Sequence, residues 1–178
     1  MSRNAHRGID DAPLTVAVDS TVFRRALGCF ATGLTVVTAA SPAGPVGFTC
    51  QSFSSLSLDP PLVTIHPGRS STTWPLIRDT GRFCVNVLAG DQEHLSVAFA
   101  RGDTDRFAHV GWKPSRCEGT PVLDGVLAWF DCRIVAEYEG GDHTIVVGAV
   151  RDFDRAPAAA EPLLFHQGEY LPGTAAAR

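Results

Sequence analysis

Two long runs toward the C-terminal end restrict the fold more than any other part of the sequence. Residues 127–138 and 143–153 are rich in β-branched and aromatic side chains, and apolar positions alternate with polar ones. This alternation is typical of strands that bury one face of a sheet. The four residues between them, Glu139-Gly140-Gly141-Asp142, have the composition of a tight turn. The sequence therefore predicts a long antiparallel hairpin.

Shorter strand-like runs precede and follow this hairpin, at 34–40, 47–58, 62–65, 83–88 and 162–171. Three helical patterns follow residues that can cap a helix N-terminus: Asp19, Ser71 or Thr72, and Asp91. We expect the first helix to close at Gly33 and the third to end near Gly102, before an irregular segment over 103–119. Because strands dominate and helices do not alternate regularly with them, the pattern favours an antiparallel barrel with peripheral helices over a doubly wound α/β sheet.

The length and the charge distribution bound the organisation and the partners. A chain of 178 residues with 44% apolar residues suits one globular domain. We expect a flexible lead-in over 1–19, the domain over 20–172 and a short tail over 173–178. The net charge is −4, the chain has no run of Lys or Arg, and no apolar stretch is long enough to cross a bilayer. We therefore expect neither nucleic acid nor a membrane as a partner.

The cysteines and histidines indicate a reducing compartment and a site without a metal. The five cysteines, at 29, 50, 84, 117 and 132, are odd in number and form no Cys-x-x-Cys pair. This usage is typical of reduced thiols in a cytoplasmic protein. The six histidines show no metal-ligand spacing, so no metal is expected.

The stretch from residue 47 to 64 is unusually rich in hydroxyl groups. Five of the nine positions from 49 to 57 are Ser or Thr, and a second cluster, Ser70-Ser71-Thr72-Thr73, stands beside Arg69 at an expected helix start. Short hydroxyl side chains and neighbouring backbone N–H groups together can bind an anion such as a phosphate. The alternative is a serine-rich connection whose hydroxyls bond the local backbone.

Five segments taken in order resemble the short-chain flavin reductase family, the reductase components of two-component flavin monooxygenases. They are residues 32–38 (TGLTVVT), 47–61 (GFTCQSFSSLSLDPP), 83–88 (FCVNVL), 141–143 (GDH) and 162–170 (PLLFHQGEY). The resemblance covers about residues 20–172. It implies a mainly β protein with a split β-barrel, antiparallel and of Greek-key type, and a few peripheral helices. It also implies a homodimer that transfers hydride from NADH or NADPH to FMN or FAD and releases reduced flavin by diffusion to a flavin-dependent monooxygenase.

The resemblance also implies which residues bind the cofactors. Flavin contacts are expected from Thr49, Cys50, Gln51, Ser52 and Ser55, phosphate contacts from Ser71 and Thr72, and further flavin contacts from Arg106 and Phe107. Cys50-Gln51 departs from the small residue followed by Asn or Ser that the family has there. His143, in the Gly-Asp-His segment, is the candidate catalytic residue on the nicotinamide side, and Tyr170 is a candidate for stacking on either ring. On position alone, His143 is a solvated turn residue and Tyr170 an aromatic that covers one end of the barrel.

The donor nucleotide and the class of activity remain open at this point. NADH is the preferred donor because the sequence has no cluster of Arg and Lys suited to a 2′-phosphate, although Arg69 alone could serve. Two other classes fit the same residues: a flavin-binding electron-transfer protein without nicotinamide turnover, and a flavin-dependent oxygenase or oxidase. Oxidation of NADH that depends on added flavin separates the reductase from both.

Overall fold

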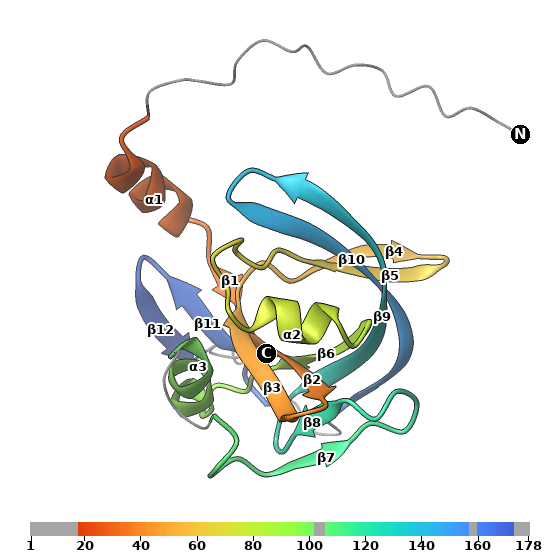
Figure 1. Ribbon diagram of the computed structural model, residues 1–178. Coiled ribbons are helices and arrows are strands. Elements are labelled where there is room, and N and C mark those ends of the chain that lie inside the picture. The colour runs from red at the N-terminus through yellow and green to blue at the C-terminus, as the bar shows by residue number, and fades with distance from the viewer. Residues whose placement is uncertain (1–17, 102–105, 157–159, 173–178) are drawn as a thin grey trace, which may run out of the picture.

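The computed structural model describes residues 18–101, 106–156 and 160–172, which form three helices and twelve strands (Figure 1). The helices are α1 (Ser20–Gly28), α2 (Trp74–Arg78) and α3 (Glu93–Ala100). The strands are β1 (Thr32–Gly33), β2 (Thr35–Ser41), β3 (Gly44–Cys50), β4 (Ser54–Leu58), β5 (Pro61–Ile65), β6 (Arg82–Val87), β7 (Trp112–Pro114), β8 (Pro121–Leu123), β9 (Ala128–Gly140), β10 (His143–Arg155), β11 (Leu163–His166) and β12 (Glu169–Pro172).

Seven of the strands form one curved antiparallel sheet in the order β3-β2-β6-β9-β10-β5-β4. The mainly β, antiparallel architecture is therefore confirmed. The sheet curls strongly but does not close through hydrogen bonds, because β3 and β4 are its two edges. These edge strands are consecutive in the chain, so residues 51–53 connect one edge of the sheet to the other. We call residues 49–53 the linker.

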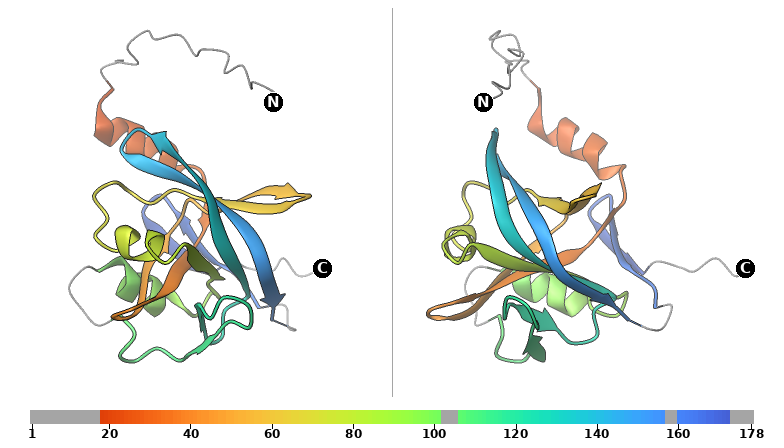
Figure 2. Two further views of the ribbon diagram at one scale, coloured as in Figure 1. Left: turned by 45° about the vertical axis from the view of Figure 1, so that its right-hand side comes forward. Right: turned by 90° about the vertical axis from the view of Figure 1, so that its right-hand side faces the viewer.

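The long hairpin expected from the sequence is present as β9 and β10, which pair from His143↔Gly140 to Arg155↔Ala128. Its register shifts between Val147 and Gly148 and between Val150 and Asp152. Bulges of this kind increase the twist of a strand pair. The hairpin bends across the molecule and projects beyond the rest of the sheet (Figure 2).

The core lies on both faces of the sheet around β2. Val36 and Val37 are both fully buried although consecutive strand residues point to opposite faces. Val36 belongs to a cluster that includes Phe99 of α3, and Val37 to one that includes Ile77 of α2. Helix α2 lies inside the curl of the sheet and α3 lies beside β3, so the two short helices cover opposite faces (Figure 1).

The helices exist where the sequence predicts them, but their ends differ. Asp19 caps α1 as expected, through bonds from the N–H groups of Thr21 and Val22. The prediction that Gly33 closes this helix is wrong: α1 ends at Gly28, and Gly33 pairs with Leu164 in a small sheet of order β1-β11-β12. Residues 32–33 pair with β11, a strand from the other end of the chain, and this tertiary contact overrides the local preference of Gly33 for a helix C-cap.

The other two caps are shifted by one or two residues. Thr73, not Ser71 or Thr72, occupies the N-cap of α2, although the Ser71 hydroxyl accepts the Trp74 N–H at 3.0 Å. Gln92, not Asp91, occupies the N-cap of α3, which ends at Ala100. The Gln92 side chain bonds the Ala89 N–H and the Asp124 carbonyl instead of capping the helix. Tertiary partners therefore set these helix ends.

The sequence also predicted an irregular segment over 103–119 and two terminal segments outside the domain. Within the segment 103–119, β7 pairs with β8, so this region is not entirely irregular. The lead-in over 1–19 and the tail over 173–178 lie outside the described residues, apart from Val18 and Asp19.

Candidate active site

A cavity of about 390 Å³ lies where the linker meets the end of β5, at the split between the two sheet edges. Its walls come from Leu34, Phe48 of β3, the linker, residues 66–68, helix α3, His143 at the β9–β10 turn and the β11–β12 hairpin. Of the residues that the sequence singled out, the structure brings six to this cavity: Thr49, Cys50, Gln51, Ser52, His143 and Tyr170. Residues up to 121 positions apart in the chain thus share one site.

Ser52 fastens the linker to the end of β5. Its hydroxyl oxygen accepts the backbone N–H of His66 at 2.8 Å and donates to the His66 carbonyl at 3.3 Å. One side chain therefore satisfies both backbone groups of His66, which lies just beyond the last residue of β5. These two hydrogen bonds hold the linker next to the end of β5, where no strand pairing does so, and they fix the path of the linker.

Thr49 ties the same wall to the opposite side of the cavity. Its hydroxyl donates to the Ser96 carbonyl of α3 at 2.6 Å, and the Ser96 hydroxyl donates to the Tyr170 phenol oxygen at 3.2 Å. The Tyr170 ring in turn packs edge-on against Phe165, with ring centroids 5.2 Å apart. A continuous chain of contacts therefore positions the aromatic wall relative to the linker.

Cys50 and Gln51 present two different polar groups at the cavity. Burial raises the pKa of the Cys50 thiol, so the group is uncharged at neutral pH, and its sulfur lies 3.2 Å from the Ser52 hydroxyl. The Gln51 amide makes no hydrogen bond to any other described residue and is exposed. Gln51 is therefore the linker side chain whose hydrogen-bonding capacity remains available to a ligand.

His143 reaches the cavity from the tight turn that opens β10. Gly141 has a φ of 71°, a left-handed conformation that favours glycine and that the hairpin turn requires. The His143 Nδ1 lies 2.7 Å from the Asp142 carboxylate, and this hydrogen bond, together with the charge of His143, lowers the pKa of the Asp142 carboxyl. Because Nδ1 is engaged, Nε2 is the ring nitrogen left for a ligand.

Backbone bonds dock this turn onto the segment that follows β5. The Arg69 N–H donates to the Asp142 carbonyl at 2.9 Å, and the Thr144 N–H donates to the Pro67 carbonyl at 2.9 Å. Gly68 and His143 also form an isolated bridge. These contacts place the Gly-Asp-His turn across the cavity mouth from the linker.

The other predicted site residues lie elsewhere. Ser55 is an exposed residue of β4, Thr72 is exposed before α2, and neither lines the cavity. Ser71 lines a second cavity next to the first. Arg106 bonds the Gly47 carbonyl and, at 2.8 Å, the Thr73 hydroxyl, so it joins β3 to the start of α2. Phe107 packs edge-on between Phe99 and Trp112 at the margin of the core.

Sequence reasoning missed several cavity residues that carry no chemical signature of their own. Phe48 and Phe165 contribute aromatic walls, and His66 and Ser96 contribute backbone and hydroxyl groups. Phe48 and Phe165 stand within the runs 47–61 and 162–170 that carried the resemblance, so those runs contained a signal. His66 and Ser96 have none, because their importance depends on which linker hydroxyl reaches them.

The cavity combines features that suit a flat ring with a polar rim. Its volume lies within the roughly 300–1,000 Å³ of ligand pockets, and it joins aromatic walls to a polar linker. Stacking on Phe and Tyr rings stabilises a planar ligand, and the Gln51 amide with nearby backbone N–H groups can bind its heteroatoms. The residues present therefore fit an isoalloxazine ring system.

Comparison with known domain families gives one match that spans most of the chain. The profile described as "Flavin reductase like domain" matches residues 27–174. The matched segment includes the linker, the Gly-Asp-His turn and the β11–β12 hairpin, which are the parts that build the cavity.

Individual relatives agree with this match. The reductase subunit of a flavin-dependent monooxygenase from Mycobacterium tuberculosis is 44% identical over 158 residues, covering 88% of this chain and 84% of the relative. An NADH-dependent FMN reductase from Agrobacterium fabrum is 45% identical over 152 residues, covering 85% of each. The crystal structure of an NADH:FAD oxidoreductase from Streptomyces globisporus with NAD and FAD fragments superposes with a TM-score of 0.81 at 39% identity, covering 88% and 96% of the two chains.

Proposed function

This chain belongs to the flavin reductase-like family, and from that membership we propose that it is an NADH-dependent flavin reductase that supplies reduced flavin to a partner monooxygenase. The observation that carries the proposal is the cavity at the split of the sheet. It joins the Thr49–Ser52 linker to the Gly-Asp-His turn, two segments that are far apart in the sequence. Relatives described as FMN and FAD reductases both exist, and both flavins are proposed substrates.

The flavin supplies the chemistry of hydride acceptance, and the protein's own residues bind and orient the reactants. Gln51 and the linker backbone bind the polar rim of the ring. Ser52 and Thr49 keep the linker in place through His66 and Ser96. His143 Nε2 orients the nicotinamide or holds a proton beside it, while Asp142 holds the imidazole through Nδ1.

The predicted cofactor-binding residues that do not line the first cavity have other proposed roles. We propose that Ser71 contacts a phosphate from the second cavity, and that Thr72 and Ser55 contact only the parts of a bound cofactor that extend beyond the ring site. Arg106 and Phe107 support the flavin site from behind, since Arg106 holds Gly47 of β3 and Phe107 packs on Phe99 of α3. Tyr170 is proposed to contact the ring directly.

A homodimer is the proposed assembly, and α1 supports it. The helix has no buried residue, and it carries a row of exposed apolar side chains together with its flanking residues: Val18, Val22, Phe23, Leu27 and Phe30. It also projects from the body of the protein (Figures 1 and 2). Exposed apolar rows of this kind mark interaction sites, and a second copy of this chain is the proposed cover.

Dilution tests this assembly together with the flavin site. Light scattering should give twice the chain mass, and FMN affinity should fall as the dimer dissociates if both copies help to form the site. Replacement of Phe23 and Leu27 by Glu should give a monomer. A monomer with full FMN affinity and full turnover contradicts the shared site.

The proposed setting is a reducing one, the cytoplasm. All five cysteines lie within the described residues, and each is unpaired. Within the described ranges, the structure has no helix that is both long enough and apolar enough to span a membrane.

The activity itself is tested by steady-state kinetics with purified protein. NADH oxidation should require added FMN or FAD, and anaerobic mixing should reduce the flavin at a rate that saturates with NADH. Addition of a flavin-dependent monooxygenase should couple that reduction to hydroxylation. Flavin that stays oxidised with NADH and with NADPH contradicts the proposal.

A further inference from the structure

Ser96 of α3 is a fully buried polar residue at the first cavity, and it contacts two walls of that cavity. Its backbone carbonyl accepts the Thr49 hydroxyl of the linker at 2.6 Å, and its side-chain hydroxyl donates to the Tyr170 phenol oxygen at 3.2 Å. A buried hydroxyl without a partner destabilises a protein, so a serine at this position needs the acceptor that Tyr170 supplies. Ser96 therefore joins α3 to both the linker and the β11–β12 hairpin.

The direction of the hydrogen bond between Ser96 and Tyr170 determines what the phenol can do. A serine hydroxyl carries one proton, and Ser96 donates that proton to the phenol oxygen. The phenol oxygen is the acceptor in this bond, so the phenol's own proton points away from Ser96. Among the residues that the structure describes, no side chain or backbone carbonyl accepts the phenol proton. Because Tyr170 lines the first cavity, this proton is available to a ligand there.

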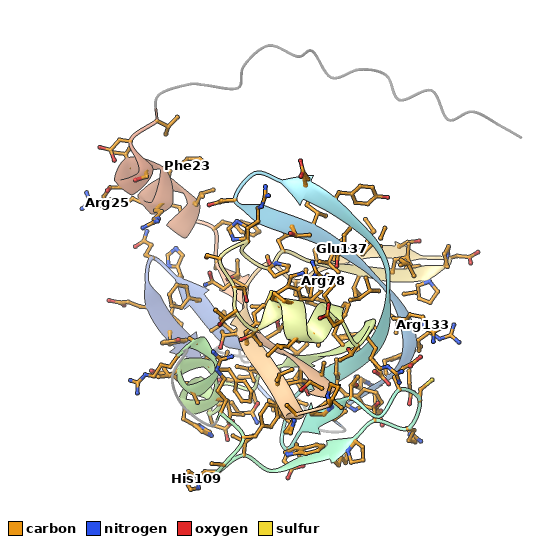
Figure 3. The ribbon with its side chains drawn as sticks, viewed as in Figure 1. Phe23, Arg25, Arg78, His109, Arg133 and Glu137 are labelled. Atoms are coloured by element: carbon orange, nitrogen blue, oxygen red, sulfur yellow. The ribbon has the colours of Figure 1, made fainter. Side chains whose placement is uncertain are left out.

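The Tyr170 phenol is held in place by its own hairpin. Tyr170 lies directly opposite Phe165 in the β11–β12 ladder, and the two rings pack edge-on with centroids 5.2 Å apart. Leu163 of the same hairpin is buried in the core. Figure 3, in the view of Figure 1, shows α3 and this hairpin side by side with side chains between them. A donor that is already fixed loses little entropy when it binds an acceptor.

The acceptor that this donor fits best is on the flavin ring. The phenol is connected through Ser96 to Thr49, and so to the linker wall, whereas His143 stands on the separate turn that docks on residues 67–69. The linker offers its backbone N–H groups and the Gln51 amide to one part of the ring. Tyr170 adds a donor from the other side of the cavity, and the carbonyl oxygens and ring nitrogens of a flavin can accept from both.

We propose that Tyr170 is a hydrogen-bond donor to an acceptor atom of the flavin ring, and that Ser96 is the positioning residue that orients this donor. A donor that is fixed before binding also stabilises negative charge that develops at such an acceptor. This inference rests on the proposed reductase function, and it names two residues that determine how the flavin site holds the ring.

Three variants test these roles: Tyr170→Phe, Ser96→Ala and the two changes together. Tyr170→Phe keeps the ring and removes the donor, so the Kd for FMN in a fluorescence titration should rise roughly five- to tenfold. Ser96→Ala keeps the phenol and the backbone carbonyl that holds Thr49, and it removes only the orientation of the donor. The Kd should then rise roughly two- to threefold. The double variant should match Tyr170→Phe, because no phenol proton remains to be oriented.

The absorption spectrum of bound FMN gives a second readout that does not depend on turnover. A hydrogen bond to the ring shifts its visible bands, so Tyr170→Phe should move the bands away from their wild-type position. Ser96→Ala should move them in the same direction by a smaller amount. One matched control is Ser115→Ala, which removes another buried serine hydroxyl that donates to Asp131 away from the cavity. The other is Tyr138→Phe, at the second tyrosine of the chain. Both controls should leave the Kd for FMN within twofold of wild type and the bands unmoved.

The outcomes separate this inference from the proposed function. If circular dichroism shows Tyr170→Phe folded and its Kd for FMN stays within twofold of wild type, the proposal is overturned. It is also overturned if the effects of the two single changes multiply in the double variant, since Ser96 then acts independently of the phenol. A raised KM for NADH with normal FMN binding would move the acceptor to the nicotinamide and overturn it too. The expected changes in FMN binding, in a wild type that does not reduce FMN with NADH, would contradict the proposed function and leave this inference standing.

Discussion

The two walls of the first cavity are held in different ways. The linker wall is fixed by side chains, with Ser52 bonded to both backbone groups of His66 and Thr49 bonded to Ser96. The turn wall is held by backbone bonds alone, and its side chains face solvent: the exposed fraction is 49% for His143 and 93% for Asp142.

This difference separates a preformed wall from an adaptable one. A wall whose groups are already in place loses little entropy when a ligand binds, which suits the reactant whose ring must be fixed. An exposed turn suits a reactant that enters and leaves in every cycle. We therefore expect linker substitutions to change flavin affinity, and turn substitutions to change the kinetics of NADH.

The largest effect is expected from Ser52→Ala. The change leaves the His66 N–H and carbonyl without their partner, and the linker loses its attachment to β5. FMN affinity should fall by roughly ten- to a hundredfold, with a loss of about 1–3 kcal/mol in the free energy of unfolding. Fluorescence titration and urea unfolding measure the two quantities.

Ser41→Ala is the matched control for that variant. The Ser41 hydroxyl also bonds a backbone carbonyl, that of Gly44 at 2.7 Å, but in the β2–β3 hairpin and away from the cavity. FMN affinity should stay within twofold of wild type. If the two variants weaken FMN binding equally, the linker has no special role.

His143→Ala should give the next largest effect and should leave FMN affinity unchanged. The kcat/KM for NADH should fall about tenfold, because the ring nitrogen that we propose to face the nicotinamide is lost. His94→Ala is the control, since His94 is also exposed and also makes one local contact through Nδ1. A tenfold change in the Kd for FMN with normal NADH kinetics would reverse the assignment of the two walls.

Asp142→Asn should give a smaller loss of the same kind. The carboxylate orients the His143 ring, but the pair is exposed, so we expect a two- to threefold decrease in kcat/KM for NADH. Asp142→Glu, which keeps a carboxylate, should retain most of the wild-type kcat/KM for NADH. A positioning role predicts that the pH profile of kcat/KM shifts in Asp142→Asn, whereas a purely structural role predicts a lower rate with the same profile.

The smallest functional effect is expected from thiol modification. Burial raises the pKa of Cys50, so little thiolate forms at pH 7.5, whereas Cys29 and Cys117 are exposed. Iodoacetamide should label Cys50 at least about tenfold more slowly than the exposed pair, and bound FMN should persist. Peptide mass spectrometry follows each site. Rapid labelling of Cys50 would show that the linker wall opens and is not preformed.

The alternation of apolar and polar residues along the chain predicted many of the strands. The β9–β10 hairpin follows from alternation over 127–153, since that alternation matches a half-buried sheet. The helix ends were less predictable because tertiary partners decide them. Gly33 pairs with Leu164, and the Gln92 side chain bonds Asp124, and neither partner is visible in the local sequence.

Part of the cavity lining was predictable from local motifs, whereas the roles of these residues stay predictions. Thr49–Ser52 and Gly141–His143 were recognised as motifs, and the structure places Thr49–Ser52 and His143 at one cavity. Arg106 and Phe107 were assigned from the resemblance, as a basic residue followed by an aromatic one, and their contacts run to Gly47, Thr73 and Phe99. Sequence order does not determine which face of the core a loop residue contacts, so those contacts required the structure.

A crystal structure of the protein with FMN bound would place the flavin relative to the two walls of the first cavity. We predict that the ring occupies the first cavity, against the linker and beside Tyr170. The Gln51 amide and the linker N–H groups should lie on its polar rim, and His143 Nε2 on its open side. FMN bound elsewhere, with the space between Thr49–Ser52 and the Gly-Asp-His turn filled only by water, would contradict it.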